Sequence, residues 1–172
     1  MISRFCLLLI ACFILVTNSK CKRTQSNTFK DIDGNIYSSA LIGEYWWMTE
    51  NLKSTRFNDG SNIPCIRDQS IWLRLDSSAY CYYQNNENFA DTLGFLYNWY
   101  AVNSGKLCPT GWRVPTDNEW MQIAGGSSGF WWTSTEASAS SAYYRSLIYS
   151  FEQVARDTHP KRMGFSVRCI KN

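Results

Sequence analysis

The chain has 172 residues, of which 45% are hydrophobic, 16% aromatic and 18% charged. This balance excludes an intrinsically disordered protein, which needs few apolar and many charged residues. The formal net charge of +3 is too small for a nucleic-acid-binding surface. A single histidine excludes a histidine-rich metal cluster. The length predicts one domain with at most a short tail.

Residues 1–21 are typical of an export signal. Arg4 precedes the apolar run 5–16, which suits the core of a signal peptide and is too short to span a bilayer. Two processing routes remain open. In one, the chain is cleaved after Ser19. In the other, Cys21 is acylated as in bacterial lipoproteins, although the preceding Lys20 is larger than the residue usual at that position.

The seven cysteines favour the lipoprotein route. Cys6 and Cys12 leave with the signal, and lipidation of Cys21 then leaves an even number. The remaining four, for which three disulfide pairings are possible, are Cys65, Cys81, Cys108 and Cys169. No Cys-x-x-Cys pair of a structural zinc site occurs among them. We therefore expect a membrane-anchored lipoprotein of the cell envelope, with a periplasmic or secreted protein as the alternative.

The mature chain reads as a polar tether over residues 22–28 and one strand-rich domain over 29–171. The turns Asp33-Gly34-Asn35 and Asn58-Asp59-Gly60 separate short runs of strand-forming residues. Strands are expected at 28–32, 36–42, 44–48, 79–83, 130–135, 143–151 and 165–170.

Two helices are also expected. The first covers the dense apolar run 94–102. The second runs from Asp117 to about Ala124, because Thr116 and Glu119 have the spacing of a capping box and Gly125-Gly126 would end the helix.

Several blocks together carry a family resemblance. They are Asp31-x-Asp33-Gly34-Asn35-x-Tyr37, Trp47 to Lys53 (WMTENLK), Gly94 to Val102 (GFLYNWYAV), Cys108 to Thr116 (CPTGWRVPT) with Glu119-Trp120, and Gly164 to Cys169 (GFSVRC). In this order the blocks resemble the Fibrobacter succinogenes major paralogous domain, a family of exported bacterial proteins that includes many lipoproteins. The resemblance extends over about residues 29–171.

This resemblance implies an α+β, C-type-lectin-like fold with two short helices and a small twisted antiparallel sheet. It also implies a disulfide between Cys108 and Cys169, whereas a Cys65–Cys81 bond depends on cysteine parity alone. Only residues 121–129 separate the Glu-Trp helix from the Phe-Trp strand, where family members usually carry a longer stretch. We therefore expect a shortened upper loop region.

The residues do not predict catalysis or a cofactor. The only histidine, His159, stands beside Pro160 in a polar stretch and is expected in an exposed loop. The acidic residues around Gly34 lack the glutamate that would complete an EF-hand, because Ile42 stands at that position. We expect no metal site and no calcium-dependent sugar site.

The expected function is a non-catalytic cell-envelope module that binds protein or glycan. In related lectin-like domains the ligand face uses the last strands and their loops, and tyrosine, tryptophan and arginine dominate binding surfaces. The candidate ligand-binding residues are Trp132, Glu136, Tyr143, Tyr144, Arg145, Arg156 and His159. The alternative function is a structural or adhesin subunit of a surface assembly. Neither hypothesis includes a nucleic-acid partner, and membrane contact is expected only through the lipid anchor.

Overall fold

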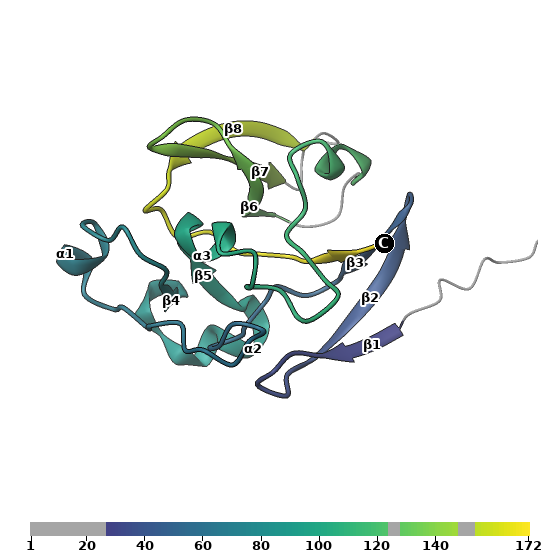
Figure 1. Cartoon of the computed structure of the whole chain (residues 1–172), viewed down its shortest axis with the longest axis horizontal. Helices are drawn as coiled ribbons and strands as arrows, with labels where there is room; N and C mark the ends of the chain where they lie inside the picture. Colours follow the sequence, from purple (N-terminus) through teal and green to yellow (C-terminus); the bar gives the residue numbers. More distant parts are fainter. Residues whose placement is uncertain (1–26, 124–127, 148–153) are drawn as a thin grey trace, which may run out of the picture.

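The computed structural model of the protein describes residues 27–123, 128–147 and 154–172 (Figure 1). The expected signal peptide, Cys21, the Gly125-Gly126 helix stop and the end of the 143–151 strand lie outside these ranges. Within them, no helix is long and apolar enough to cross a membrane.

Strands dominate and form three antiparallel sheets in the described part of the chain (Figure 1). The first sheet has the order β1-β2-β3-β9, the second pairs β4 with β5, and the third has the order β6-β7-β8. The strands are β1 Asn27–Lys30, β2 Ile36–Ile42, β3 Tyr45–Met48, β4 Tyr80–Tyr82, β5 Phe95–Tyr97, β6 Gly129–Glu136, β7 Ser141–Leu147, β8 Ala155–Pro160 and β9 Ile170–Lys171.

Helices are short throughout the described ranges, and each α-helix has four or five residues. They are α1 Gln69–Trp72, α2 Ala90–Leu93 and α3 Trp99–Asn103, with 3₁₀ helices η1 Tyr83–Asn85, η2 Glu87–Phe89 and η3 Glu119–Gln122. The expected α+β, C-type-lectin-like fold with two helices and one small sheet is therefore wrong. The chain is mostly β and has three sheets. The shortened upper loop region was expected as part of a lectin-like fold, so that expectation is wrong together with the fold.

The hairpin expected around Asp33-Gly34-Asn35 is confirmed. β1 and β2 pair antiparallel, and Gly34 turns the chain with a φ of +86°. The carboxylate of Asp31 accepts hydrogen bonds from the backbone N–H groups of Asp33 and Asn35 at 3.0 and 2.9 Å. The turn at residues 58–60 and the strands expected near 45–48, 80–82 and 130–135 are also present.

The run 94–102 is part strand and part helix, so the expectation of a single helix is wrong. Phe95–Tyr97 form β5, which pairs with β4, and α3 begins after Asn98. The Asn98 side chain caps α3 by accepting a hydrogen bond from the N–H of Ala101. Most of the run is buried, so it lacks the alternation of apolar and polar residues that identifies a half-exposed strand.

The second expected helix is a 3₁₀ helix, η3. Glu119 accepts hydrogen bonds from the backbone N–H and the hydroxyl of Thr116 at 2.7 and 2.9 Å, so half of the capping box forms. The hydroxyl donates to this carboxylate instead of accepting from a helix N–H. Arg113 donates to the same carboxylate from Nη1 and Nη2 at 2.8 and 2.6 Å. These contacts fix a turn and do not begin a longer helix.

The extended segment 164–171 connects all three sheets, although only its last two residues form a regular strand, β9. The carbonyl of Phe165 accepts from the N–H of Tyr97 in β5, and that of Ser166 accepts from the N–H of Trp132 in β6. The carbonyl of Cys169 accepts from the N–H of Met48 in β3. The single strand expected over 165–170 is therefore a segment whose partners change along its length.

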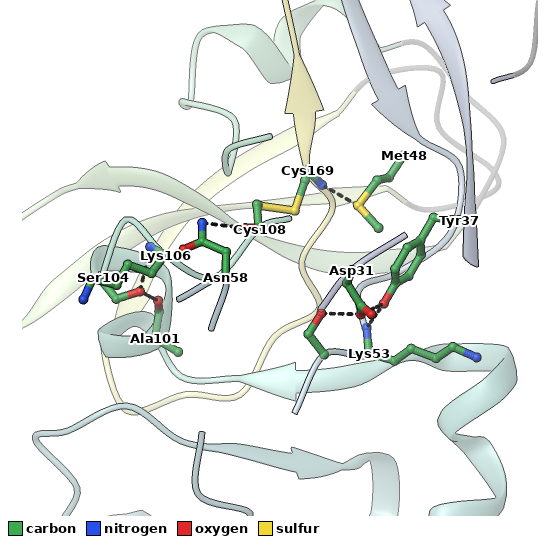
Figure 2. Close-up of a disulfide and its surroundings, with 11 residues drawn as sticks. Asp31, Tyr37, Met48, Lys53, Asn58, Ala101, Ser104, Lys106, Cys108 and Cys169 are labelled. Carbon is green, nitrogen blue, oxygen red and sulfur yellow. Dashed lines mark hydrogen bonds between the residues drawn. A yellow bond between two sulfur atoms is a disulfide. The ribbon is translucent and has the colours of Figure 1, made fainter. Parts of the chain in front are cut away.

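One disulfide, between Cys108 and Cys169, ties this segment to the loop after α3, as expected (Figure 2). The bonded cysteines are buried, and the N–H of Cys169 donates to Met48 Sδ at 3.2 Å. Close by, the buried carboxylate of Asp31 accepts from the hydroxyls of Tyr37 and Ser54 at 2.8 and 2.5 Å (Figure 2). The core thus contains a disulfide and, close to it, a buried carboxylate that accepts several hydrogen bonds.

Residues 108–122 have little regular structure but many specific contacts. The backbone of Arg113 exchanges two hydrogen bonds with Ile170, at 2.9 and 2.8 Å. The carboxylate of Asp117 binds Arg145 Nε and Arg156 Nε, each at 2.6 Å. These contacts fix the segment against β9, β7 and β8.

Candidate functional site

The β6-β7-β8 sheet carries most of the candidate ligand-binding residues, but the structure divides them between its two faces. Tyr144 pairs with Trp132 on β6, and Arg145 pairs with Trp131 and with Arg156 on β8. Because neighbouring side chains of a strand point to opposite faces, Tyr144 and Arg145 belong to different surfaces.

Trp132 cannot serve as an exposed platform, because it is fully buried at 0% exposure. Its Nε1 donates to the carbonyl of Tyr97 at 2.9 Å, and its ring packs against Phe165 with centroids 4.7 Å apart. Trp131, its neighbour in sequence, is also buried. Both members of this pair are therefore covered, and the candidate Trp132 does not form part of an open surface.

On the first face, the candidates Tyr143, Arg145 and Arg156 are held by contacts within the protein. Arg145 is 5% exposed and donates to Asp117 Oδ1 and, at 2.9 Å, to the Asp117 carbonyl. Arg156 donates to the other carboxylate oxygen, and its guanidinium lies 3.8 Å from the centre of the Tyr143 ring. Hydrogen bonding to Asp117 raises the pKa of Arg156, and burial opposes that shift. These residues brace the sheet.

Glu136 forms an ion pair with Lys161, which is nearly buried. Lys161 Nζ also donates to the Ala139 carbonyl at 2.8 Å and lies 4.9 Å from the centre of the Trp99 ring. This candidate therefore closes the β6–β7 turn onto the core.

The opposite face of the sheet carries aromatic rings that remain partly accessible. Tyr144 and His159 both pack on Phe165, with ring centroids 4.7 and 5.5 Å away. Phe130 stacks on Phe165 at 5.9 Å and is 52% exposed. The expected exposed loop around His159 is wrong, because His159 lies in β8 and is half-buried.

Two polar groups accompany these rings. His159 Nδ1 is buried and has no hydrogen-bond partner among the described residues. Burial raises the pKa of Tyr144, and the charge of Asp157 adds to that shift. Of the candidate ligand-binding residues, Tyr144 and His159 are the two that the structure brings together on a partly open face.

Phe130 and Phe165 continue from this face into a groove with a volume of about 450 Å³. We call it the aromatic groove, and its main lining residues are Tyr83, Leu93, Leu96, Phe130, Phe165 and Ser166, with Asn51 and Trp131 at its wall. Tyr83 and Leu93 are exposed large side chains like Phe130. Three apolar side chains of different segments therefore face solvent around one hollow.

A second hollow of about 270 Å³ adjoins the groove, because Leu96 and Gly164 line both. A Cβ on Gly164 would lie 3.3 Å from side-chain atoms of both Leu96 and Trp72, so a glycine keeps the junction open. Arg67, Gln69, Gln84 and Asn85 supply planar polar side chains around this hollow.

The backbone that lines part of the second hollow adopts an uncommon conformation. Gln84 and Asn85 have φ values of 52° and 55°, which are infrequent for residues other than glycine. Such conformations are enriched at ligand-binding positions.

Cys65 and Cys81 both carry free thiols, so the disulfide expected from cysteine parity is not formed. The backbone of Cys65 forms an isolated β-bridge with that of Tyr80, and Cys81 is the next residue along β4. Its side chain therefore points to the other face of the strand from that of Tyr80 and lines the second hollow. Burial raises the pKa of Cys81 to about 11, and nearby Cys65 adds to the shift.

The acidic residues of the first hairpin are occupied by protein donors. Asp33 accepts hydrogen bonds from the backbone N–H of Thr55 at 2.5 Å and from Arg56 Nε at 2.6 Å. With Asp31 equally engaged, this turn has no free carboxylate to bind a cation. The described ranges contain no group of three or more metal-ligating side chains.

Sequence reasoning missed the groove because its residues come from five separate segments. The family blocks did contain a signal: Asn51, Leu96, Gly164 and Ser166 each lie in one of the blocks quoted above. Nothing in the local pattern around Tyr83 or Leu93 indicates that these side chains share a hollow with Phe130.

Comparison with known proteins gives one finding on the family. The model of the Fibrobacter succinogenes major domain matches residues 41–126, half of the chain. No curated protein and no solved structure matches the chain. The matched range includes β3, β4, β5, α3 and the first cysteine of the disulfide. The chain belongs to the Fibrobacter succinogenes major domain family.

Proposed function

We propose that the protein is a non-catalytic binding module of the cell envelope that recognises a glycan chain in the aromatic groove. The observation that carries the proposal is the convergence of exposed Tyr83, Leu93 and Phe130 on one apolar hollow. Exposed large apolar groups gathered in this way are typical of binding sites.

The chemistry of the groove and of the second hollow favours a sugar chain. The C–H face of a pyranose ring packs on an aromatic ring, as Phe130 and Tyr83 allow. The sugar hydroxyls need donors and acceptors, and Gln69 and Gln84 in the second hollow offer planar amides with both. Because the two hollows meet at Gly164, a chain of several sugar units can extend from one into the other.

The groove suits an extended peptide less well. Peptides commonly bind by adding a strand to a free sheet edge. Here the backbone N–H groups of Phe165 and Ser166 already donate to the carbonyls of Tyr97 and Phe130. These two residues of the wall therefore offer the groove their side chains and no free backbone N–H group.

A glycan-array screen of the full-length protein, followed by calorimetry on the best ligand, tests the proposal. Phe130→Ala should weaken binding about tenfold or more, because truncating an aromatic anchor commonly costs over 1.4 kcal/mol. The matched control is Leu41→Ala, since Leu41 on β2 has the same 52% exposure and lies outside the groove. A chelator should leave the affinity unchanged, because neither hollow is lined by an aspartate or a glutamate.

Two results would contradict the proposal. One is an array without any retained glycan. The other is equal affinity of the Phe130→Ala and Leu41→Ala variants. A silent array combined with concentration-dependent self-association would instead favour the structural or adhesin subunit.

A further inference from the structure

Arg168 is a largely buried cation at the wall of the aromatic groove. Its Nε donates to Asn51 Oδ1 at 3.2 Å, and its guanidinium lies 5.0 Å from the centre of the Trp131 ring. Asn51 and Trp131 both line the groove. Ser166, two residues earlier in the same extended segment, lines it as well. Arg168 therefore contacts two residues of the groove wall and borders the groove without being one of its lining residues.

The charge of Arg168 is unusual among the described residues, because it is only partly exposed and has no ion-pair partner. Eight other cationic side chains each pair with a carboxylate: Lys53, Arg56, Arg67, Lys106, Arg113, Arg145, Arg156 and Lys161. The other described cations without such a partner are exposed: Lys30, Arg74, Arg162 and Lys171.

The nearest acidic influence on Arg168 comes from Glu50, whose carboxylate is engaged elsewhere. Glu50 Oε2 accepts from the N–H of Ser38 and the hydroxyl of Thr49, both at 2.9 Å. Burial lowers the pKa of Arg168, and the charge of Glu50 opposes that shift only in part. A guanidinium stays protonated even so, so the protein holds a poorly compensated positive charge here.

We propose that the aromatic groove takes an acidic glycan, whose carboxylate binds Arg168 while its sugar rings pack on Phe130 and Tyr83. This inference rests on the proposed function and adds the class of sugar. The described residues use only the Nε–H of Arg168. The Nη groups are left to a ligand, and the planar fork of a guanidinium matches the two oxygens of a carboxylate.

The test compares uronic-acid hexamers with their carboxyl-reduced counterparts, which keep the chain and lose the charge. Galacturonate, glucuronate and mannuronate hexamers are the probes, titrated into the full-length protein. At least one uronate should bind about tenfold more tightly than its reduced form. This advantage should shrink as salt is raised, because screening weakens a partly exposed charge pair.

Variants locate the carboxylate contact. Arg168→Gln should remove the preference for the uronate, and Arg168→Lys should retain part of it, since lysine keeps the charge without the fork. The matched control, Arg162→Gln, changes an exposed arginine that donates to the Leu75 carbonyl and should keep the full preference. Because Arg168→Gln risks misfolding, the salt dependence of the unmodified protein stands as an independent measurement.

The outcomes separate this inference from the proposed function. If every uronate binds within twofold of its reduced form, and Phe130→Ala abolishes both, the groove binds glycans but the acidic class is wrong. If no hexamer binds, both proposals are overturned. If a polyglutamate peptide binds through Arg168 and no uronate does, the ligand is an acidic protein segment and both are likewise overturned.

Discussion

The segment 108–122 and the aromatic groove are held together by different kinds of interaction. The segment contains a single 3₁₀ helix and is fixed by a disulfide, by a buried ion pair and by paired backbone groups. The groove is walled by ring packing, and several of its apolar side chains face solvent. Specific contacts can hold an irregular segment rigid, whereas partly open apolar surface is tolerated where a ligand can cover it.

Removal of the disulfide should give the largest loss of stability and tests whether specific contacts hold the segment 108–122 in place. Its loop spans 61 residues, so replacing Cys108 and Cys169 by serine should cost roughly 4 kcal/mol on the loop-entropy model. Chemical denaturation measures the loss. The control is Cys65→Ser, which removes an exposed free thiol and should change stability little. An unchanged melting temperature after verified reduction of the unmodified protein would contradict the prediction.

Asp117 gives the next largest effect. Asp117→Asn should lower stability by about 3 kcal/mol, because it leaves Arg145 buried without a counter-charge. Asp59→Asn is the matched control: the Asp59–Lys106 pair is exposed, so its loss should lower stability far less than the loss of the buried pair. Urea unfolding of both variants measures the difference, and equal losses would rule out a special role for the buried pair.

Substitution of Glu119 should give the smallest change in stability, and this change should depend on pH. Hydrogen bonding from Arg113 is the main cause that lowers the pKa of Glu119 to about 2, while burial opposes the shift. The folded-state pKa lies below the unfolded value, so this stabilisation is complete above about pH 4.5 and is lost as the pH falls towards 2. Denaturation across this range should lose part of its pH slope in Glu119→Gln, and an identical slope would refute the assignment.

The sequence predicted those elements whose signals are local. Asp33-Gly34-Asn35 predicted a turn, because aspartate, glycine and asparagine are the residues typical of tight hairpin turns. Runs rich in strand-forming residues predicted β3, β4 and β6. The strand β8 was missed, because Ala155–Pro160 is a polar edge strand with one half-buried residue. A strand that is exposed on both sides has no apolar alternation to reveal it.

The candidate site was less predictable, because it depends on which faces are covered. Tryptophan is a residue type common at binding surfaces, but Trp132 packs against Phe165 and donates its indole N–H to the Tyr97 carbonyl inside the protein. Arg145 and Arg156 resemble ligand-binding arginines until Asp117, which is 28 residues before Arg145, is placed beside them. Only the tertiary structure distinguishes a charge that braces the fold from one, such as Arg168, that has no carboxylate partner among the described residues.

The extended segment 164–171 has a consequence for the order of folding. It pairs with residues near 48, 97, 113 and 131, so its contacts span most of the described chain. None of the three sheets has all its neighbours until this segment has left the ribosome. Such long-range contacts slow folding, since the loops between partners must close first. We therefore expect nascent chains lacking residues 164–171 to remain without stable tertiary structure and to be open to proteases.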